Sequence, residues 1–444
     1  MKSEKFSVAY LAGYLCQLSL PQNFLLAYSG GMDSHVLLHA LSCITAPGWS
    51  VAAVHINHGL HPAAGDWAQH CRQTCERLQV PITVIDIDAS PRAGESPEAC
   101  ARIARYTALS AHLAPGQVLL TAHHLDDQAE TCLLQLLRGS GVRGLAAMPA
   151  RQTFAKGEMV RPLLEINREE LLVYARSEQL NWVEDNSNQD VQFDRNYLRQ
   201  QVMPVLQARW PAANRSFSQS SRHAAEASEL LDELAAGDLQ RGQHSTDQLD
   251  LRILSDLSAL RSSNALRYWL HSADVRPPGR KRLQEFVRQL QQANVDRTPR
   301  LVWDDVELCC YQHTLYLLKA LPNRLSTDTL QCNIKALPEL PYGQLKLEHA
   351  VGTGLAYHYL QDNNLRIRFR HGGEKIQLAG HAEHKTLKNI LQEHKLPPWL
   401  RDFLPLIYYD NILVMIPGIG TVEGYQARAD EPGVSFNWDW SFQY

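Results

Sequence analysis

The stretch from residue 24 to residue 41, FLLAYSGGMDSHVLLHAL, decides the fold of the first half of the chain. Phe24 to Tyr28 is a run of five apolar residues, which is typical of a strand buried on both faces of a parallel sheet. Gly30 and Gly31 then permit a tight loop whose backbone N–H groups can approach an anion closely. The apolar residues between Val36 and Leu41 predict a buried helix, whose N-terminus would point back at this loop. Strand, glycine loop and helix together predict a phosphate-binding site.

This loop does not follow the P-loop pattern, which requires a lysine directly after its second glycine. No lysine stands between Lys5 and Lys156. The six residues from Ser29 to Ser34, SGGMDS, resemble instead the SGGxDS loop of the PP-loop ATP pyrophosphatases, enzymes that adenylate a substrate and release pyrophosphate. An ordinary turn between strand and helix is the structural alternative. The resemblance implies that ATP binds to Ser29, Gly30, Gly31, Met32, Asp33 and Ser34.

Asp33 places a carboxylate inside this predicted phosphate loop. A carboxylate repels phosphate unless a divalent cation lies between them. We therefore expect Mg2+ to bind at Asp33 together with the nucleotide.

The composition describes a globular protein of several domains. The 444 residues are 45% hydrophobic and carry a net charge of -4, which leaves ample core and argues against wholesale coating of nucleic acid. The nine cysteines include no CxxC pair, so a reducing compartment is expected. Helical spacing of apolar residues between Val8 and Leu20 predicts a first helix in place of a signal peptide. No stretch is apolar enough to cross a membrane, so we expect a cytoplasmic protein with no membrane partner.

Further strands are predicted at Val51 to Ile56, Val80 to Ile87 and Val118 to Ala122. The first of these runs into His55, Asn57 and His58. Ligands of parallel α/β sheets bind at the carboxyl ends of the strands, so we predict that these three residues contact the nucleotide. A lone histidine would more often be a core or surface residue.

A second polar cluster, HHLDDQAET, follows the strand that ends at Ala122. On a helix, His123, Asp127 and Glu130 share one face. Such a face can bind a metal or transfer a proton, and its hard oxygen ligands favour Mg2+ over zinc. Acidic residues in a first turn also simply stabilise a helix. We predict catalytic roles for Asp33, His123, Asp127 and Glu130, with Asp33 and Asp127 as metal ligands.

Arginines further along the chain are candidates for holding phosphate. Arg195 stands in the sequence DRNYLR and is predicted to be catalytic, because it could clamp the nucleotide or the pyrophosphate. In the alternative, Arg195 or Arg199 forms a structural ion pair with Asp185.

The alternation of strands and helices predicts an α/β catalytic domain with a parallel sheet over residues 1–215. A helical middle domain is expected over residues 216–321 and a small α+β domain over residues 345–444. Residues 261–300 hold nine Arg or Lys and three Asp or Glu, which predicts a basic face, although a solvated helix face would have the same composition.

The order of the motifs resembles the tRNA(Ile)-lysidine synthetase family. The motifs are SGGMDS, HINHGLH, EACARIARY, HHLDDQAET, RGSGVRGL, RPLL, EDNSN and DRNYLR in about the first 200 residues, and KLPPWLR near the C-terminus. His61 departs from the family pattern, which usually has arginine there.

This resemblance implies an ATP-dependent ligase. ATP would adenylate O2 of the wobble cytidine in the CAU anticodon of tRNA(Ile), and the ε-amine of free L-lysine would then attack C2. AMP would leave and lysidine would remain, which changes codon reading from AUG to AUA. The implied partners are therefore tRNA(Ile) and L-lysine, with a homodimer as one alternative for the oligomeric state.

Three other functions fit the residues less well. Thiolation of tRNA needs cysteines to carry sulfur or an iron-sulfur cluster, and no CxxC pair is present. A ligase for small molecules would not need additional domains with a basic face. A catalytically inactive RNA-binding protein would not need intact SGGMDS and HHLDDQAET motifs.

The amine nucleophile raises a question of roles. Lysine arrives protonated, since its reference pKa is about 10.4, so a base must accept a proton before the attack. His123 and Asp127 are the candidates, with Glu130 binding the ammonium group. The rival assignment makes all three residues metal ligands.

Overall fold

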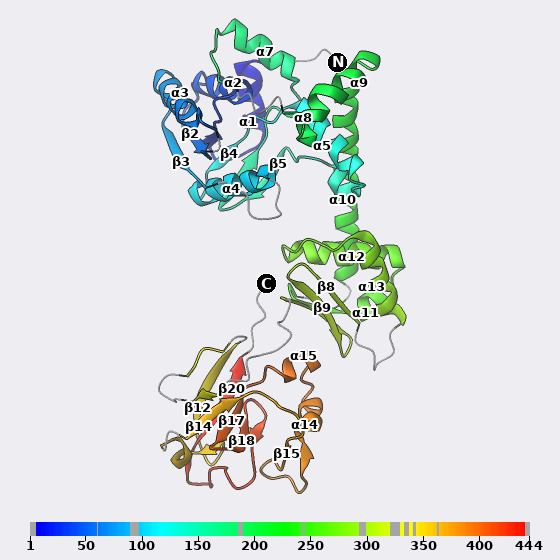
Figure 1. The fold of residues 1–444 in the computed structure, drawn as a ribbon. Coiled ribbons are helices and arrows are strands. Elements are labelled where there is room, and N and C mark those ends of the chain that lie inside the picture. The colour runs from blue at the N-terminus through cyan, green and yellow to red at the C-terminus, as the bar shows by residue number, and fades with distance from the viewer. Residues whose placement is uncertain are drawn as a thin grey trace. The chain divides into compact units, whose positions relative to one another are not determined.

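The computed structural model describes residues 6–59, 61–88, 97–184, 190–240, 242, 245–292, 299–319, 329–332, 337–340, 343–361 and 364–439. The chain forms two compact units, Met1–Leu231 and Asp232–Tyr444. The first unit contains the predicted nucleotide loop (Figure 1).

A six-stranded sheet forms the centre of the first unit. Its order is β3-β2-β1-β4-β6-β5, and neighbouring strands are parallel except β5 and β6. This confirms the predicted α/β domain, to which the antiparallel edge strand β5 is an addition. The strands are β1 (Asn23–Ala27), β2 (Ser50–Asn57), β3 (Ile82–Asp86), β4 (Val118–Leu120), β5 (Arg151–Phe154) and β6 (Gly157–Val160).

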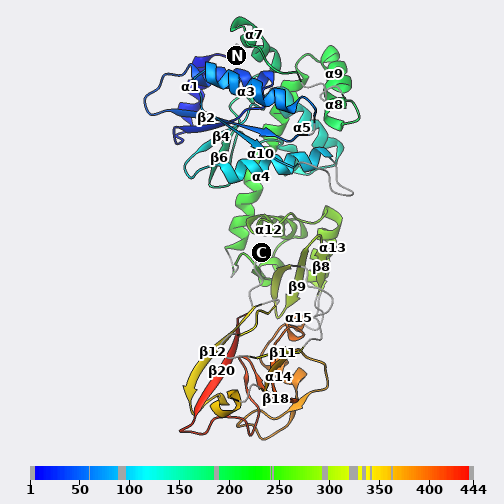
Figure 2. The same cartoon turned by 60° about the vertical axis from the view of Figure 1, so that its left-hand side comes forward.

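Helices cover both faces of this sheet (Figure 2). Phe24 and Leu26 of β1 belong to the core shared with α1, α2 and α7, whereas Leu25 belongs to the core on the other face, with Leu109 of α4. Successive side chains of a strand point to opposite faces, which is why β1 must be apolar throughout. The helices are α1 (Val8–Gln17), α2 (Met32–Ser42), α3 (Ala64–Arg77), α4 (Pro97–His112), α5 (Leu125–Leu137), α6 (Val142–Leu145), α7 (Arg168–Ser177), α8 (Asp194–Tyr197), α9 (Met203–Arg209) and α10 (Ala213–Leu239).

The strand order reverses beside β1. The chain runs outward from β1 to β2 and β3, then returns to place β4 on the other side of β1. Loops that leave two such strands diverge, and ligands of parallel sheets bind in the crevice between them. The residues that follow Ala27 and Leu120 therefore lie where a ligand is expected.

The second unit begins with a region that combines helices and an antiparallel sheet. Its helices are α11 (Arg252–Ser255), α12 (Ala259–Ser272) and α13 (Arg280–Gln292). The sheet, of order β7-β10-β9-β8, was not predicted, because a short buried run such as that of β9 cannot be told from a helix by periodicity. Its strands are β7 (Gln248–Asp250), β8 (Arg300–Trp303), β9 (Val306–Tyr311) and β10 (Thr314–Lys319).

The C-terminal part of the second unit is the predicted small α+β module. Its strands form sheets of order β11-β14-β17-β18-β19, β12-β20-β13 and β15-β16. The strands are β11 (Leu330–Gln331), β12 (Gln344–Val351), β13 (Leu355–Ala356), β14 (Leu365–Arg368), β15 (Lys375–Ile376), β16 (Lys385–Thr386), β17 (Leu406–Tyr409), β18 (Ile412–Ile416), β19 (Gly420–Thr421) and β20 (Pro432–Asp439), and the helices are α14 (Leu387–Glu393) and α15 (Pro398–Arg401).

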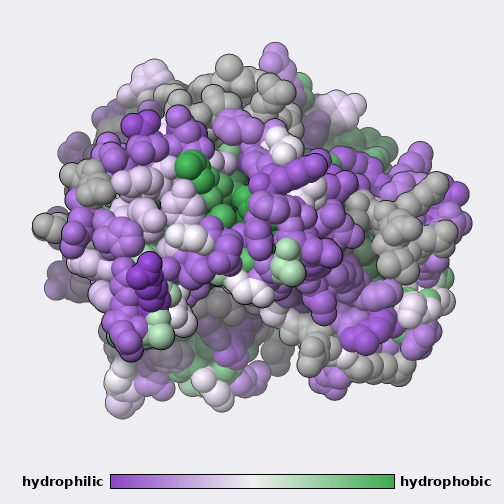
Figure 3. Space-filling model, turned by 90° about the horizontal axis from the view of Figure 1, so that it is seen from below, coloured by the Kyte–Doolittle hydropathy of each residue, from purple (hydrophilic) through white to green (hydrophobic). Residues whose placement is uncertain are grey.

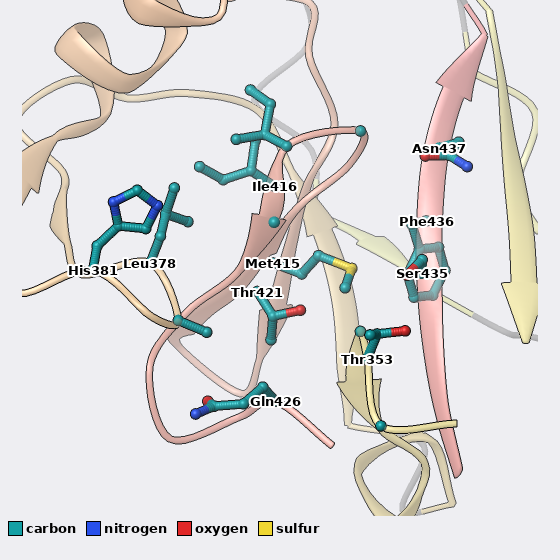
Figure 4. A pocket seen from close by; sticks show the side chains of 16 residues that line it. Thr353, Leu378, His381, Met415, Ile416, Thr421, Gln426, Ser435, Phe436 and Asn437 are labelled. Atoms are coloured by element: carbon teal, nitrogen blue, oxygen red, sulfur yellow. The ribbon is translucent and has the colours of Figure 1, made fainter. Parts of the chain in front are cut away.

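A pocket of about 390 Å³ lies within this module. Figure 4 shows that Leu378 and His381 border it on one side, with Met415 of β18 and Phe436 of β20 further along. Its lining mixes apolar side chains with neutral polar ones and includes no Asp, Glu, Lys or Arg. This pocket therefore offers no carboxylate to an ammonium group and no lysine or arginine to a phosphate.

The face of the molecule drawn in Figure 3 is largely hydrophilic, and its hydrophobic residues appear in separate small groups, the most distinct of them near the centre of the view. Within the part of the chain that the structure describes, no helix is long and apolar enough to cross a membrane.

The buried histidine of α2 makes the stability of the first unit depend on pH. His35 is 3% exposed, and burial, together with the charges of His70 and Arg77, lowers the pKa of His35 to about 4. The unfolded chain binds this proton near pH 6.5. Stability is therefore lost as the pH falls from about 6.5 to about 4, by about 3 kcal/mol.

We expect the urea midpoint of unfolding to decrease over this pH window. The decrease should be smaller for His35→Gln than for the wild type or for His384→Gln, which changes an exposed histidine. Equal pH dependence in all three proteins would contradict the assignment to His35.

Candidate active site

The loop from Ser29 to Ser34 joins β1 to α2, and hydrogen bonds of the Ser34 side chain connect its two ends. Gly30 has a φ of +87°, and a Cβ there would lie 3.0 Å from Sγ of Cys71, so both the backbone and the space require glycine. The Ser34 hydroxyl donates to the Gly31 carbonyl at 3.0 Å and accepts from the N–H of Ser29 at 3.3 Å. The free N–H groups and positive dipole end of α2 face this loop, as in other phosphate sites.

Asp33 stands in the first turn of α2. Its Oδ1 is buried and has no hydrogen-bond partner, and the nearest cation, Nε of Arg168, is 3.9 Å away. A buried acceptor without a donor is unfavourable, so this oxygen fits a ligand of Mg2+, which commonly takes one or two carboxylates and phosphate oxygens. Among the described residues, no group of three or more His, Cys, Asp or Glu could hold a metal. The nucleotide would have to supply further ligands.

Helix α5 begins at Leu125, after the two histidines. His124 is its N-cap: its Nδ1 accepts from the N–H of Asp127 at 3.4 Å, and Asp127 Oδ2 accepts from the N–H of His124 at 3.1 Å. Such a reciprocal pair fixes a helix start. The expectation that His123 shares a helix face with Asp127 and Glu130 is therefore wrong, because His123 lies before the helix.

His123 lies beside Thr121, with 2.9 Å between its Nδ1 and the threonine Oγ1. Burial lowers the pKa of His123 to about 4, so the ring is neutral at pH 7. A base with this pKa is very weak beside an amine whose pKa is about 10.4. The predicted role of His123 as a base stays a prediction, without support from this environment.

Asp127 and Glu130 bind two arginines that come from a distant part of the chain. Arg195 places Nε 3.0 Å from Glu130 Oε2 and Nη2 3.0 Å from Asp127 Oδ1. Arg199 places Nε 2.7 Å from Glu130 Oε1 and Nη2 2.8 Å from Asp127 Oδ1. The Glu130 side chain is 3% exposed and that of Asp127 is 12% exposed. Two buried carboxylates and two guanidiniums thus form one neutral cluster.

This pairing affects the roles predicted for Asp127. Burial alone would raise the pKa of Asp127, but the electrostatic interactions with His124 and with the guanidinium of Arg195 outweigh it and hold that pKa below its usual range. The carboxylate is therefore a weak base while its cations are in place. Its proposed roles as metal ligand and as base both stay predictions, and in this structure its oxygens are engaged by protein donors.

His124 connects the nucleotide loop to this cluster. Its Nε2 lies 3.7 Å from Asp33 Oδ2 and 3.4 Å from Asp127 Oδ2. Burial alone would lower the pKa of His124, but these carboxylates outweigh burial and raise it above its usual value. Because Nδ1 accepts from the N–H of Asp127, the ring proton is on Nε2, which faces both carboxylates. His124 was not among the residues predicted to be functional. Asp127 stands three positions after His124, as the acidic residue of a capping box does, and this spacing could have identified His124 as the N-cap of α5.

Two further contacts were not predicted. Arg199 lies on a π-helical turn, Leu198–Val202, directly after α8, which carries Arg195. The spacing of four residues between the arginines was the signal in the sequence. Asp126 accepts from the N–H of Arg168 at 3.0 Å and from the side-chain amide of Asn214, so it joins α5 to the starts of α7 and α10. Asp185, the predicted alternative partner, lies outside the described residues.

The residues at the end of β2 support the crevice. His55 is buried, and its Nδ1 donates to the Tyr28 carbonyl at 2.9 Å. Asn57 donates to Asp86 Oδ1 at 2.8 Å and thereby holds the ends of β2 and β3 together. His58 follows β2. Their predicted contact with nucleotide stays a prediction.

The metal assignment predicts the behaviour of two variants. Asp33→Ala should lose at least about a factor of ten in both pyrophosphate release and product formation, because it removes the metal-side carboxylate, and raised Mg2+ or Mn2+ should restore part of it. If Asp127 serves as base, Asp127→Asn should keep pyrophosphate release and lose only the second step. Loss of both steps would instead indicate a metal ligand.

The matched control is Asp66→Ala, which removes an exposed carboxylate from the first turn of α3. It should leave both steps unchanged. Full activity of Asp33→Ala would rule out the metal role of Asp33.

Three family models match the chain in order. A PP-loop domain covers residues 8–206, a TilS substrate binding domain covers residues 249–316, and a TilS substrate C-terminal domain covers residues 365–438. Together they account for both compact units of the chain.

Relatives match over nearly the whole length. The tRNA(Ile)-lysidine synthase of Coxiella burnetii is 41% identical over 442 residues, which cover 99% of this chain and 96% of that protein. The synthases of Alkalilimnicola ehrlichii and Yersinia pseudotuberculosis are 41% and 38% identical, over 94% and 95% of this chain and 94% and 97% of those proteins. The chain therefore belongs to the tRNA(Ile)-lysidine synthase family, as its motifs predict.

Proposed function

We propose that this enzyme ligates free lysine to C2 of the wobble cytidine in the CAU anticodon of tRNA(Ile), and that ATP is cleaved to AMP and pyrophosphate. The observation that carries the proposal is the closed SGGMDS loop beside a buried cluster of carboxylates and arginines at the reversal of strand order. The loop suits phosphate and the cluster suits an amine. ATP carries the phosphates and lysine carries the amine, and these are the two substrates that react with the cytidine in the family's reaction.

The first step is adenylation of the cytidine. Its O2 is a poor leaving group until it carries AMP, so O2 attacks the α-phosphorus of ATP and pyrophosphate leaves. Negative charge grows on the phosphates during this step, and preorganised donors stabilise such charge most effectively. The backbone around Gly30 and Gly31 and the N-terminus of α2 supply these donors. Mg2+ held by Asp33 and the phosphates would neutralise further charge.

The second step is attack of the lysine ε-amine on C2, which expels AMP. The amine needs a binding site rich in negative charge and a group that accepts its proton. Asp127 and Glu130 provide two carboxylates side by side on α5, and both contact the same guanidiniums. We assign the ammonium group of the substrate to this pair and leave the choice of base between Asp127 and His123 to the half-reaction test.

The second unit is proposed to bind the tRNA. Arg280 and Lys281 are exposed and stand at the start of α13, which has no acidic residue in its first turn. Cations at this end oppose the helix dipole and weaken the helix. Helix stability therefore does not explain why Arg280 and Lys281 stand at this end of α13. Both cations are well suited to contact the phosphates of RNA.

The substrates also suggest where and how the enzyme works. We place it in the cytoplasm, where tRNA, ATP and free lysine occur together. A homodimer stays a prediction.

The reaction itself can be tested with the purified protein, ATP, labelled lysine and a tRNA(Ile) transcript that carries the CAU anticodon. We expect lysidine, AMP and pyrophosphate to form in equal amounts, and no incorporation of lysine when the wobble cytidine is replaced by uridine. Release of AMP that depends on tRNA but leaves no lysine in the RNA would contradict the proposal.

The tRNA assignment predicts a change in salt dependence. In the full-length protein, the double change Arg280→Ala and Lys281→Ala should weaken tRNA binding and reduce the slope of log affinity against log salt by about one to two. The control exchanges Glu285 and Arg288, which pair at 2.8 Å on the same helix, for glutamines and keeps the net charge. Equal slopes for the wild type and both variants would remove α13 from the RNA interface.

A further inference from the structure

The proposed lysine site is already occupied by the protein's own cations. Glu130 Oε1 accepts from Arg199, and Glu130 Oε2 accepts from both Arg195 and Arg199. Asp127 Oδ1 accepts from both arginines, and Asp127 Oδ2 accepts from the N–H of His124. Every oxygen of both carboxylates is thus bound, and two guanidiniums balance two carboxylates. In this state the cluster has no net negative charge with which to attract an ammonium group.

We infer that Arg195 and Arg199 keep the lysine site closed until nucleotide binds, and that they then leave Asp127 and Glu130 for the phosphates of ATP. The two carboxylates become available to the ammonium group of lysine only after this exchange. The inference rests on the proposed function and adds an order to it, with nucleotide before lysine.

The layering of the cluster suits such an exchange. The carboxylates lie beneath, at 3% and 12% exposure, and the arginines cover them, at 25% exposure for Arg195 and 36% for Arg199. A ligand that arrives from solvent therefore meets the guanidiniums first. Both stand in one continuous helical stretch from Asp194 to Arg209, with Arg195 on α8 and Arg199 on the π-helical turn that joins α8 to α9. Single π-helical turns are uncommon and occur frequently at functional sites.

The nucleotide loop is close enough to receive the arginines. His124 Nε2 lies 3.4 Å from Asp127 and 3.7 Å from Asp33, so one imidazole separates the cluster from the loop. Burial alone would lower the pKa of Arg199, but its hydrogen bond to Glu130 and the charges of Glu130 and Asp127 raise that pKa, and the charge of Asp33 adds to this effect. A guanidinium binds phosphate with the same two-pronged geometry with which it binds carboxylate.

The exchange couples the two ligands through charge. A guanidinium that moves to the phosphates leaves a buried carboxylate without a partner, which is strongly unfavourable. The ammonium group of lysine removes this penalty when it takes the vacated position. Nucleotide should therefore tighten lysine binding, and by linkage lysine must tighten nucleotide binding by the same factor. A permanent structural ion cluster predicts neither effect.

The experiment measures binding of radiolabelled L-lysine to the full-length protein by equilibrium dialysis, without tRNA. The measurement is made with and without α,β-methylene-ATP and Mg2+, which occupy the nucleotide site but do not react. For the wild type we expect lysine affinity to rise at least about ten-fold with the nucleotide analogue. The affinity for the analogue should rise by the same factor when lysine is saturating.

Variants assign the effect to the arginines. Arg199→Gln should bind lysine without nucleotide about as tightly as the wild type does with it, so that the coupling approaches a factor of one. If Arg199→Gln does not fold, Arg199→Lys replaces it in the test. This variant keeps a cation but loses the paired contacts, so it should retain only part of the coupling. The control Arg151→Gln removes another arginine with paired contacts, to Glu158 at 2.8 and 2.9 Å on the β5–β6 hairpin, and should behave as wild type.

Two results would overturn the inference. One is equal lysine affinity with and without the analogue in the wild type. The other is weaker lysine binding by Arg199→Gln in both states, which would place the arginine on the lysine carboxylate. If the wild type forms lysidine but shows no coupling, only this inference fails. If lysidine does not form, the proposed function fails first.

Discussion

Two buried carboxylates on α5 constrain the whole catalytic centre. A carboxylate removed from water costs several kcal/mol unless cations and donors surround it, so Asp127 and Glu130 require Arg195, Arg199 and His124 around them. This requirement holds α8 and its π-helical turn against α5 and fixes where α5 begins. Buried ion pairs add little net stability compared with apolar packing. The cluster is therefore better explained by its chemistry than by the stability it gives the fold.

The same centre depends on the reversal of strand order beside β1. That reversal brings the loop after β1 and the start of α5 to one crevice, although long stretches of sequence separate them. In the proposed reaction, the phosphates bind to backbone donors that are fixed by Gly30 and the two serines of the loop. The amine of lysine would bind to side chains of α5. The sheet holds the two sets of groups next to each other, with His124 between Asp33 and Asp127.

The two compact units suggest a division of labour. The first unit carries the nucleotide loop and the ion cluster, and the second carries the basic start of α13, which opposes its own helix dipole. Cations at a helix N-terminus destabilise the helix, and contacts with the phosphates of a bound RNA would offset this loss of stability. The chemistry and the recognition of tRNA would thus reside in parts of the chain with separate cores, so that each could change without repacking the other.

Local rules of apolar runs, glycine backbone freedom and charge were enough to predict the parallel α/β unit, the loop after β1 and a metal-binding role for Asp33, and the structure confirms the first of these. The sequence also placed Asp127, Glu130 and Arg195 among the predicted functional residues. Only the tertiary structure showed that they form one cluster with Arg199, whose bonds to α5 span 69 and 72 residues of sequence. It alone moved the helix start past His123 and revealed the sheet of the middle region. Side-chain partners far apart in the chain, and short strands with no periodic signature, are decided by the packing of the whole unit and not by any local pattern.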